Sequence, residues 1–185
     1  MSTITFICDG AQKESIKTGV WGIIKNHYFN SAFPNTNAKY EDEGDEIYLE
    51  RLDELMKNSL CQIEDTETGV CVTFDSTEEA GFSIASEVYG TSMGYSDNGL
   101  PYIIPVFEKI FEQFPSVPFD AHAECADGWT EQEYDVSNDG TTLKINSIEI
   151  QVYHQIFKML EEDNDIEIIS EETGVPVEEI EELLG

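Results

Sequence analysis

Basic residues, long apolar runs and paired cysteines are all scarce in this chain. Only 9 of its 185 residues are Lys or Arg, against 39 Asp and Glu, which gives a formal net charge of −30 at pH 7. Such a charge argues against binding to phosphate backbones or anionic membranes, because both would be repelled. No apolar run approaches the ~20 residues of a membrane span, and the N-terminal segment lacks a signal-peptide pattern. The expected location is therefore the cytoplasm.

Catalytic and metal-binding motifs are also missing. The four cysteines are scattered and form no C-x-x-C pair, which predicts buried, reduced thiols and not a zinc site. The sequence contains no G-x-S-x-G, no phosphate-binding loop and no H-E-x-x-H. These absences predict a protein that is not an enzyme and that has no cofactor.

Aromatic residues, in contrast, are plentiful. The chain has ten Phe, eight Tyr and two Trp, and 40% of its residues are apolar. A disordered acidic chain is poor in such residues, so a packed core is expected, with the carboxylates outside it. These carboxylates repel one another in the folded protein. Added salt screens the repulsion, so it should make folding more favourable.

Hydrophobic periodicity and turn residues predict a mixture of helices and strands. The predicted strands are 3–8, 60–64, 69–75, 81–89, 118–126, 131–137 and 141–150. The predicted helices are 12–33, 47–58, 102–114 (opened by Pro101), 150–162, 167–173 and 177–184. The fold class is α+β, an antiparallel sheet with helices packed on one face, plus a helical C-terminal extension. Residues 1–148 are expected to form the α+β domain and residues 149–185 the acidic helical extension.

Residues 81–140 carry a resemblance to a known family. The strand FSIASEV leads through a Gly-rich loop to the helix VFEKIFEQFPSVPF, followed by DAHAECADGW and the polar strand EQEYDV. This order resembles the ferredoxin-like Api92/YubB-like proteins of phages and mobile elements, over about a third of the chain. The resemblance implies a βαββαβ arrangement and a mobile-element origin, and it carries over no catalytic residues.

The last two helices also look like half of a helix-turn-helix. In DNA-binding proteins of that type, the second helix contacts the groove. Here that helix carries no basic residue and has the wrong sign for phosphate contact. Its acidic residues are Glu178, Glu179, Glu181 and Glu182. The preferred interpretation is a solvated helical cap that packs through its apolar residues.

His122 has acidic residues close to it in the sequence. Asp120, His122 and Glu124 share one face of a predicted strand, and Glu131, Glu133 and Asp135 could share a face of its neighbour. This set could hold a divalent metal. The alternative, an exposed polar sheet face, is favoured, and no metal site is predicted.

The acidic residues concentrate in segments 41–54, 112–139 and 161–182. Carboxylates on a helix face or on alternate strand positions lie about 5–7 Å apart, so rows of them can imitate a phosphate track. We therefore expect a nucleic-acid mimic, a stoichiometric inhibitor that binds the basic nucleic-acid groove of a defence nuclease, of the anti-CRISPR or anti-restriction type. The alternatives are an acidic protein-interaction module, or solvation and halophilic adaptation without mimicry. The predicted partner-binding residues are Glu41, Asp42, Glu43, Asp45, Glu46, Asp120, Glu124, Asp127, Glu131, Glu133, Asp135, Glu178, Glu179 and Glu182.

Overall fold

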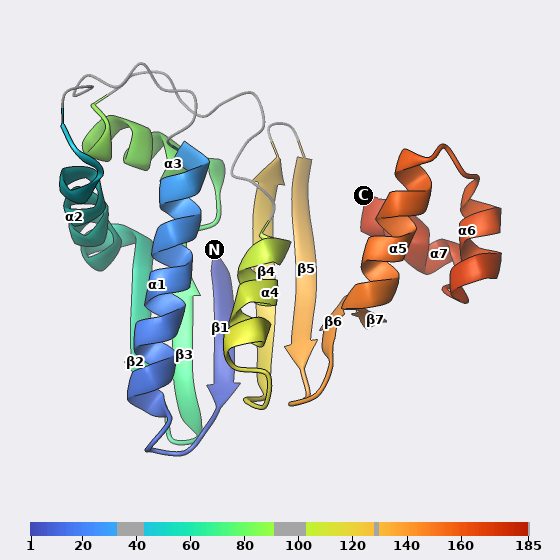
Figure 1. The fold of residues 1–185 in the computed structure, drawn as a ribbon, viewed down its shortest axis with the longest axis horizontal. Coiled ribbons are helices and arrows are strands. Elements are labelled where there is room, and N and C mark those ends of the chain that lie inside the picture. The colour runs from blue at the N-terminus through green and yellow to red at the C-terminus, as the bar shows by residue number, and fades with distance from the viewer. Residues whose placement is uncertain (33–42, 91–102, 128–129, 185) are drawn as a thin grey trace.

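The computed structural model describes residues 1–32, 43–90, 103–127 and 130–184. In this part of the chain, seven antiparallel strands form one sheet in the order β2-β3-β1-β4-β5-β6-β7 (Figure 1). The strands are β1 (Ser2–Ile7), β2 (Cys61–Asp65), β3 (Gly69–Phe74), β4 (Phe119–Asp127), β5 (Thr130–Asn138), β6 (Leu143–Ile145) and β7 (Ile148–Glu149). The predicted combination of helices with an antiparallel sheet is confirmed.

Seven α-helices and two short π-helical segments accompany the described strands. The α-helices are α1 (Lys13–Ala32), α2 (Asp45–Leu55), α3 (Glu78–Ser83), α4 (Ile104–Gln113), α5 (Ile150–Glu161), α6 (Ile166–Thr173) and α7 (Val177–Leu184). The π-helical segments η1 (Met56–Leu60) and η2 (Ile84–Val88) directly continue α2 and α3. None of these helices combines the length and apolar composition that crossing a membrane requires.

The first strand lies inside the sheet, between β3 and β4. Its Ile4 and Phe6 are fully buried, while Thr5 and Ile7 on the opposite face are exposed. A strand was predicted over residues 3–8, and its buried side chains face the helices. Strand β1 therefore has a core face and an open face, as its two neighbours do.

Helices α1 and α4 lie across the same face of the sheet (Figure 1). The chain passes from β1 through α1 and α2 to β2, and from β3 through α3 and α4 to β4. The buried stripe of α1 follows a helical period and consists of Ile16, Val20, Ile24 and Tyr28. The two helices touch at Gly19, where a Cβ atom would lie 2.5 Å from Cζ of Phe114. Gly19 thus allows a close approach that a larger residue would prevent.

Segment 81–89 was predicted as a strand, and that prediction is wrong. It is helical in α3 and η2. The alternation of Phe82 with Ile84 suggested a strand, yet Phe82 is 49% exposed. Ala80, Ile84, Ala85 and Val88 are among its buried residues, and the last three follow Ala80 by four, five and eight positions, which fits a helix face.

Two other boundaries also differ from the prediction. The predicted strand 141–150 is a hairpin of β6 and β7, because Asn146 and Ser147 form a two-residue turn with φ angles of 47° and 72°. This is the backbone of the tight turns that join antiparallel strands. Helix α4 begins at Ile104 with Pro105 in its first turn, whereas Pro101 lies outside the described residues.

The sheet ends at Glu149, and α5, α6 and α7 follow as predicted. Helix α6 ends at Gly174, whose φ of 74° is the left-handed conformation that suits glycine. Apolar side chains of the three helices are buried, namely Ile150, Tyr153, Ile156, Met159, Ile169, Ile180 and Leu183. That residues 149–185 form a separate domain stays a prediction.

Candidate interaction surface

The face of the sheet opposite α1 and α4 carries the acidic side chains of β4 and β5. In β4, Asp120, His122 and Glu124 are exposed, and the residues between them are buried. In β5, Glu133 and Asp135 are exposed on either side of the buried Tyr134. Four of the predicted partner-binding carboxylates, Asp120, Glu124, Glu133 and Asp135, therefore share this open face.

Strand register places these side chains in cross-strand pairs. His122 lies opposite Asp135, and its Nδ1 is 3.0 Å from Oδ1 of that carboxylate. This hydrogen bond raises the pKa of His122, and the nearby charges of Asp135, Glu133 and Glu124 add to the increase. Glu124 lies opposite Glu133, and like charges directly opposite each other destabilise a sheet.

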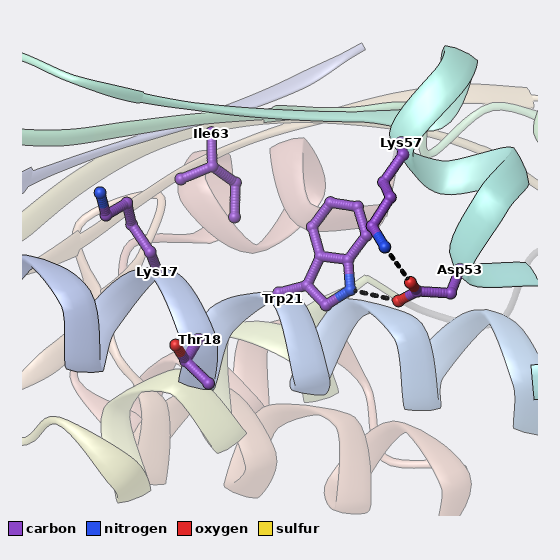
Figure 2. Close-up of a pocket in the computed structure, with 6 residues that line it drawn as sticks. All are labelled: Lys17, Thr18, Trp21, Asp53, Lys57 and Ile63. Atoms are coloured by element: carbon purple, nitrogen blue, oxygen red, sulfur yellow. Dashed lines mark hydrogen bonds and ion pairs between the residues drawn. The ribbon is translucent and has the colours of Figure 1, made fainter. Parts of the chain in front are cut away.

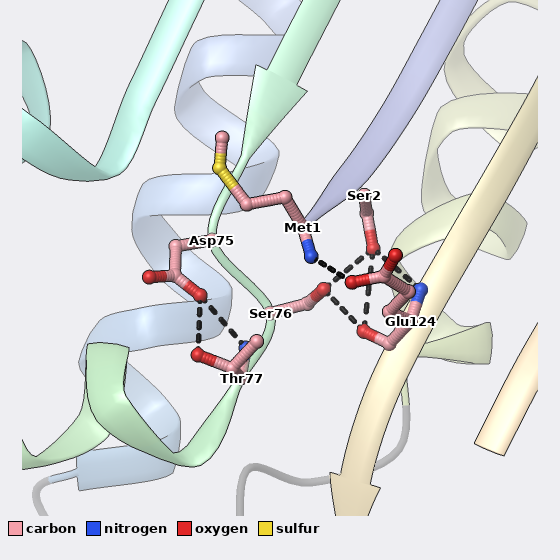
Figure 3. A network of polar contacts seen from close by, with 6 residues as sticks. All are labelled: Met1, Ser2, Asp75, Ser76, Thr77 and Glu124. Carbon is pink, nitrogen blue, oxygen red and sulfur yellow. Dashed lines mark hydrogen bonds and ion pairs between the residues drawn. The ribbon is translucent and has the colours of Figure 1, made fainter. Parts of the chain in front are cut away.

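A polar cluster at one end of the sheet holds Glu124 in place (Figure 3). The buried hydroxyls of Ser2 and Ser76 hydrogen-bond to each other, and the Ser76 hydroxyl donates to the carbonyl oxygen of Glu124. The backbone N–H of Glu124 donates to Oγ of Ser2 at 3.2 Å. The terminal ammonium of Met1 pairs with the Glu124 side chain and lowers its pKa. This ammonium offsets part of the repulsion between Glu124 and Glu133.

Helix α7 contributes one side chain, Glu182, to a cleft at the open face of β4 and β5. Asn146 in the β6–β7 turn accepts a hydrogen bond from the backbone N–H of Asp135 at 2.8 Å and donates its own N–H back at 2.7 Å. The turn borders a polar cleft of about 360 Å³ that is lined by β4, β5, the turn and Glu182 of α7. Its lining residues are His122, Glu133, Tyr134, Asp135, Asn146, Ser147 and Glu182. We use the name acidic surface for Asp120, Glu124, Glu133, Asp135 and Glu182.

The remaining acids of α7 also face solvent. Glu178 and Glu179 are exposed, while Ile180 and Leu183 are buried. The first two lie in the first turn of α7, where the helix dipole favours negative charge. The predicted acidic group on β4 and β5 and the one on α7 are therefore neighbours, because Glu182 of α7 lines the same cleft as Glu133 and Asp135.

The third predicted group lies elsewhere. Asp45 and Glu46 occupy the first turn of α2, and Glu43 precedes them. The Glu43 carboxylate pairs with Arg51, with oxygen–nitrogen distances of 2.6 and 3.2 Å. Helix α2 lies beyond the β2 side of the sheet, while α7 lies on the β5 side (Figure 1). This group therefore does not join the acidic surface.

Four predicted residues cannot be assigned to either group. Glu41 and Asp42 lie outside the described residues. The backbones of Asp127 and Glu131 lie in paired positions of β4 and β5, opposite Thr130 and Ala126. Their side chains are outside the described part of the structure.

Basic residues are concentrated away from the acidic surface. Five of the chain's nine, Lys13, Lys17, Lys25, Arg51 and Lys57, belong to α1, α2 and η1. On the open face, alternation in β6 brings Lys144 outward between the buried Leu143 and Ile145. The charge of the described chain is consequently uneven, with its cations mostly on the α1 and α2 side.

The polar cleft contains one histidine, His122. His122 is half exposed, and its Nδ1 faces Asp135. No hydrogen bond joins Ser147 to His122 in the described part of the chain, so the pair lacks the contact that activates a serine nucleophile. Among residues 1–32, 43–90, 103–127 and 130–184, no three His, Cys, Asp or Glu side chains are grouped to hold a metal ion.

Comparison of the chain with protein-family models, with curated proteins and with solved structures gives no match in any of the three. Sequence patterns identified the acids of β4, β5 and α7 but did not show that Glu182 lines the same cleft as Glu133 and Asp135. They also missed Glu64, which shares the open face because it alternates with the inward Ile63. That alternation was a usable signal, whereas the position of Glu182 depends on tertiary packing.

Proposed function

We propose that the protein is a non-catalytic, stoichiometric inhibitor that uses its acidic surface to occupy the nucleic-acid groove of a basic partner. The observation that carries the proposal is the gathering of five carboxylates, from β4, β5 and α7, on one side of the molecule. Neighbouring strands are ~4.8 Å apart and alternate residues ~6.7 Å, so these charges are spaced on the scale of a phosphate track. A partner that binds nucleic acid would meet a similar pattern of negative charge.

The unfavourable pair of Glu124 and Glu133 supports this function. An exposed sheet position accepts Thr or Gln without the repulsion that two opposed carboxylates bring. Adaptation to salt would spread charges of both signs over all faces, whereas five of the eight described cations belong to α1, α2 and η1. The uneven charge favours a directed surface over general solvation.

We further propose a ferredoxin-like fold of the Api92/YubB-like kind for strands β1 to β4 and the helices that connect them. Support comes from the strand order β2-β3-β1-β4 and from the helical crossovers through α1 and α4. A mobile-element origin points to a CRISPR effector or a restriction enzyme as the partner, in the cytoplasm where such nucleases act.

The test compares two variants of equal charge. One carries Asp120→Asn, Glu124→Gln, Glu133→Gln and Asp135→Asn on the acidic surface. The control carries Asp45→Asn, Glu46→Gln, Glu50→Gln and Glu54→Gln on α2, where all four side chains are exposed. Purified CRISPR effectors and restriction endonucleases are titrated with each protein, and their DNA binding is followed by fluorescence anisotropy between 50 and 300 mM salt.

The unmodified protein should displace DNA at a one-to-one ratio, and its affinity should fall steeply with salt. The sheet variant should bind at least tenfold more weakly and with a shallower salt dependence, whereas the α2 variant should stay within about twofold, because screening limits the effect of distant charges. Equal losses in both variants would show that net charge alone is responsible. If the protein displaces DNA from none of these nucleases, the assignment to defence nucleases is wrong.

A further inference from the structure

A second surface lies on the other side of the sheet, where α1 runs beside β2 (Figure 2). Lys13, Lys17, Trp21 and Lys25 recur every four residues along α1 and so form one stripe on this helix. Near one end of the stripe, Lys13 donates to the Thr66 carbonyl oxygen at 2.7 Å, and Lys17 pairs with Asp65 at 3.2 Å. These contacts connect α1 to the β2–β3 turn.

The other end of the stripe is fixed to α2. The indole N–H of Trp21 donates to Oδ1 of Asp53 at 2.8 Å, and Lys25 reaches the same oxygen at 3.2 Å. Lys57 of η1 also pairs with Asp53. Burial acts to raise the pKa of Asp53, but the hydrogen bonds from Lys57, Trp21 and Lys25 outweigh it and lower this pKa to about 2.

A groove of about 350 Å³ remains between these two attachments. It is lined by Lys17, Thr18, Trp21, Asp53, Lys57 and Ile63. The partly buried Trp21 and Ile63 provide its apolar walls, and lysine side chains stand toward both ends (Figure 2). A groove of this kind suits one large apolar side chain with negative charge on either side.

The edge of the sheet runs along the groove. Strand β2 is outermost among the described strands. Two hydrogen bonds flank β2. The carbonyl of Leu60 accepts from Asp75 N–H at 2.8 Å, and the N–H of Thr66 donates to the Gly69 carbonyl at 2.9 Å. Because both bonded residues are even-numbered, the even-numbered residues of β2 form their backbone hydrogen bonds with β3. Antiparallel ladders alternate, and the backbone groups of Ile63 and Asp65 consequently point away from the sheet.

We propose that this edge binds an extended segment of a partner protein as an additional strand. The backbone of the segment would pair with Ile63 and Asp65, while one large apolar side chain enters the groove against Trp21. Acidic residues two positions before and after it share its face of the strand and meet Lys17 and Lys57. Strand addition gains affinity from main-chain bonds and selectivity from alternate side chains, which is the combination present here.

Charge complementarity selects this occupant. The stripe and η1 bring together four of the nine basic residues, Lys13, Lys17, Lys25 and Lys57. The whole chain has a net charge of −30, so its other surfaces would attract basic segments. Glu14, Asp65 and Asp53 pair with three of these lysines. The four cations still outnumber these three acids, which favours an acidic–apolar–acidic strand over a basic one at this groove.

The test uses a capped heptapeptide, Thr-Glu-Thr-Phe-Thr-Glu-Thr, and a control in which both Glu are Lys. The peptide is added up to about 1 mM to ¹⁵N-labelled protein at 150 mM NaCl, and backbone amides are followed by NMR. Amide exchange at Ile63 and Asp65 should slow at least tenfold on binding, and the lysine peptide should bind at least tenfold more weakly. Absence of shifts around Ile63 and Trp21, or equal binding of the lysine peptide, would overturn the proposal.

Backbone pairing is tested separately with two N-methylated peptides. One is methylated at the even positions and the other at the odd positions. In one peptide the methyl groups replace the N–H groups that would bond to β2, and in the other they replace N–H groups that face solvent. Only one of the two should lose binding, by at least tenfold. The Ile63→Pro variant should also abolish binding, because an edge strand accepts proline but loses that N–H donor. If both methylated peptides bind as the parent does, strand addition is refuted even when Ile63→Pro fails to fold.

Discussion

Two glycines of α1 offer a direct test of how closely this helix packs against α4. Gly19 and Gly22 are both inside α1, and neither has a positive φ. A Cβ at Gly22 would meet no atom within 4 Å. A Cβ at Gly19 would lie 2.5 Å from Cζ of Phe114 and 2.6 Å from Nε2 of Gln113. Alanine should therefore stabilise the protein at Gly22 but not at Gly19, three residues away.

The expected magnitudes follow from two opposing effects. Alanine is favoured over glycine in a helix interior by about 1 kcal/mol, and Gly22→Ala should gain roughly that amount. Gly19→Ala has the same gain but forces Phe114 aside, and overpacking of this kind costs about 1–3 kcal/mol. The two variants should thus differ by about 1–3 kcal/mol, or roughly 2–12 °C in Tm for a chain of this size.

Urea unfolding followed by circular dichroism gives the free energy of unfolding for both variants. A double-mutant cycle with Phe114→Leu identifies the contact, because a smaller side chain should relieve the overlap and recover part of the loss. The packing argument is refuted if Gly19→Ala stabilises the protein as much as Gly22→Ala does. A coupling energy indistinguishable from zero would also contradict it.

Three further predictions concern charge. Burial lowers the pKa of His27 to about 4, with Lys109 adding to the effect, so stability should fall between pH 6.5 and 4, where only the unfolded imidazole takes up a proton. Relative to His27→Gln, the loss should reach about 3 kcal/mol, measured by urea unfolding at each pH. Asp53→Asn should cost about 2 kcal/mol at pH 7, because the pKa of Asp53 is about 2, and this difference should disappear as the pH falls through that value. Thermal scans should show Tm rising with NaCl from tens to hundreds of millimolar, and an unchanged Tm would remove the premise of strong self-repulsion.

Local patterns predicted most of the sheet. The apolar alternation of β1 and the turn between β2 and β3 are encoded by neighbouring residues, and both were found at nearly their true bounds. The segment around Ile84 was predicted as a strand because Phe82 and Ile84 occupy alternate positions. Ala80, Ile84 and Val88 are spaced four residues apart, so a helical pattern is present in the same segment. Short apolar segments of this kind fit either period, and tertiary packing decides between them.

The candidate surface was only partly predictable for a related reason. Alternation within β4 and β5 placed Asp120, Glu124, Glu133 and Asp135 on shared faces. Nothing local to α7 specifies that Glu182 borders the same cleft as Asp135. The groove beside Ile63 likewise depends on how α1 crosses the sheet, which only the folded chain defines.

The central position of β1 has a consequence for how the chain folds during synthesis. This strand is made first, but its second neighbour, β4, ends about 120 residues later. At a synthesis rate of 5–20 residues per second, that interval lasts roughly 6–24 s. Throughout it, one side of β1 has no strand to pair with, and such an edge can recruit another nascent chain. We expect the yield of folded protein to be limited by this waiting time, so that slower initiation, which keeps nascent chains apart, should raise the soluble fraction.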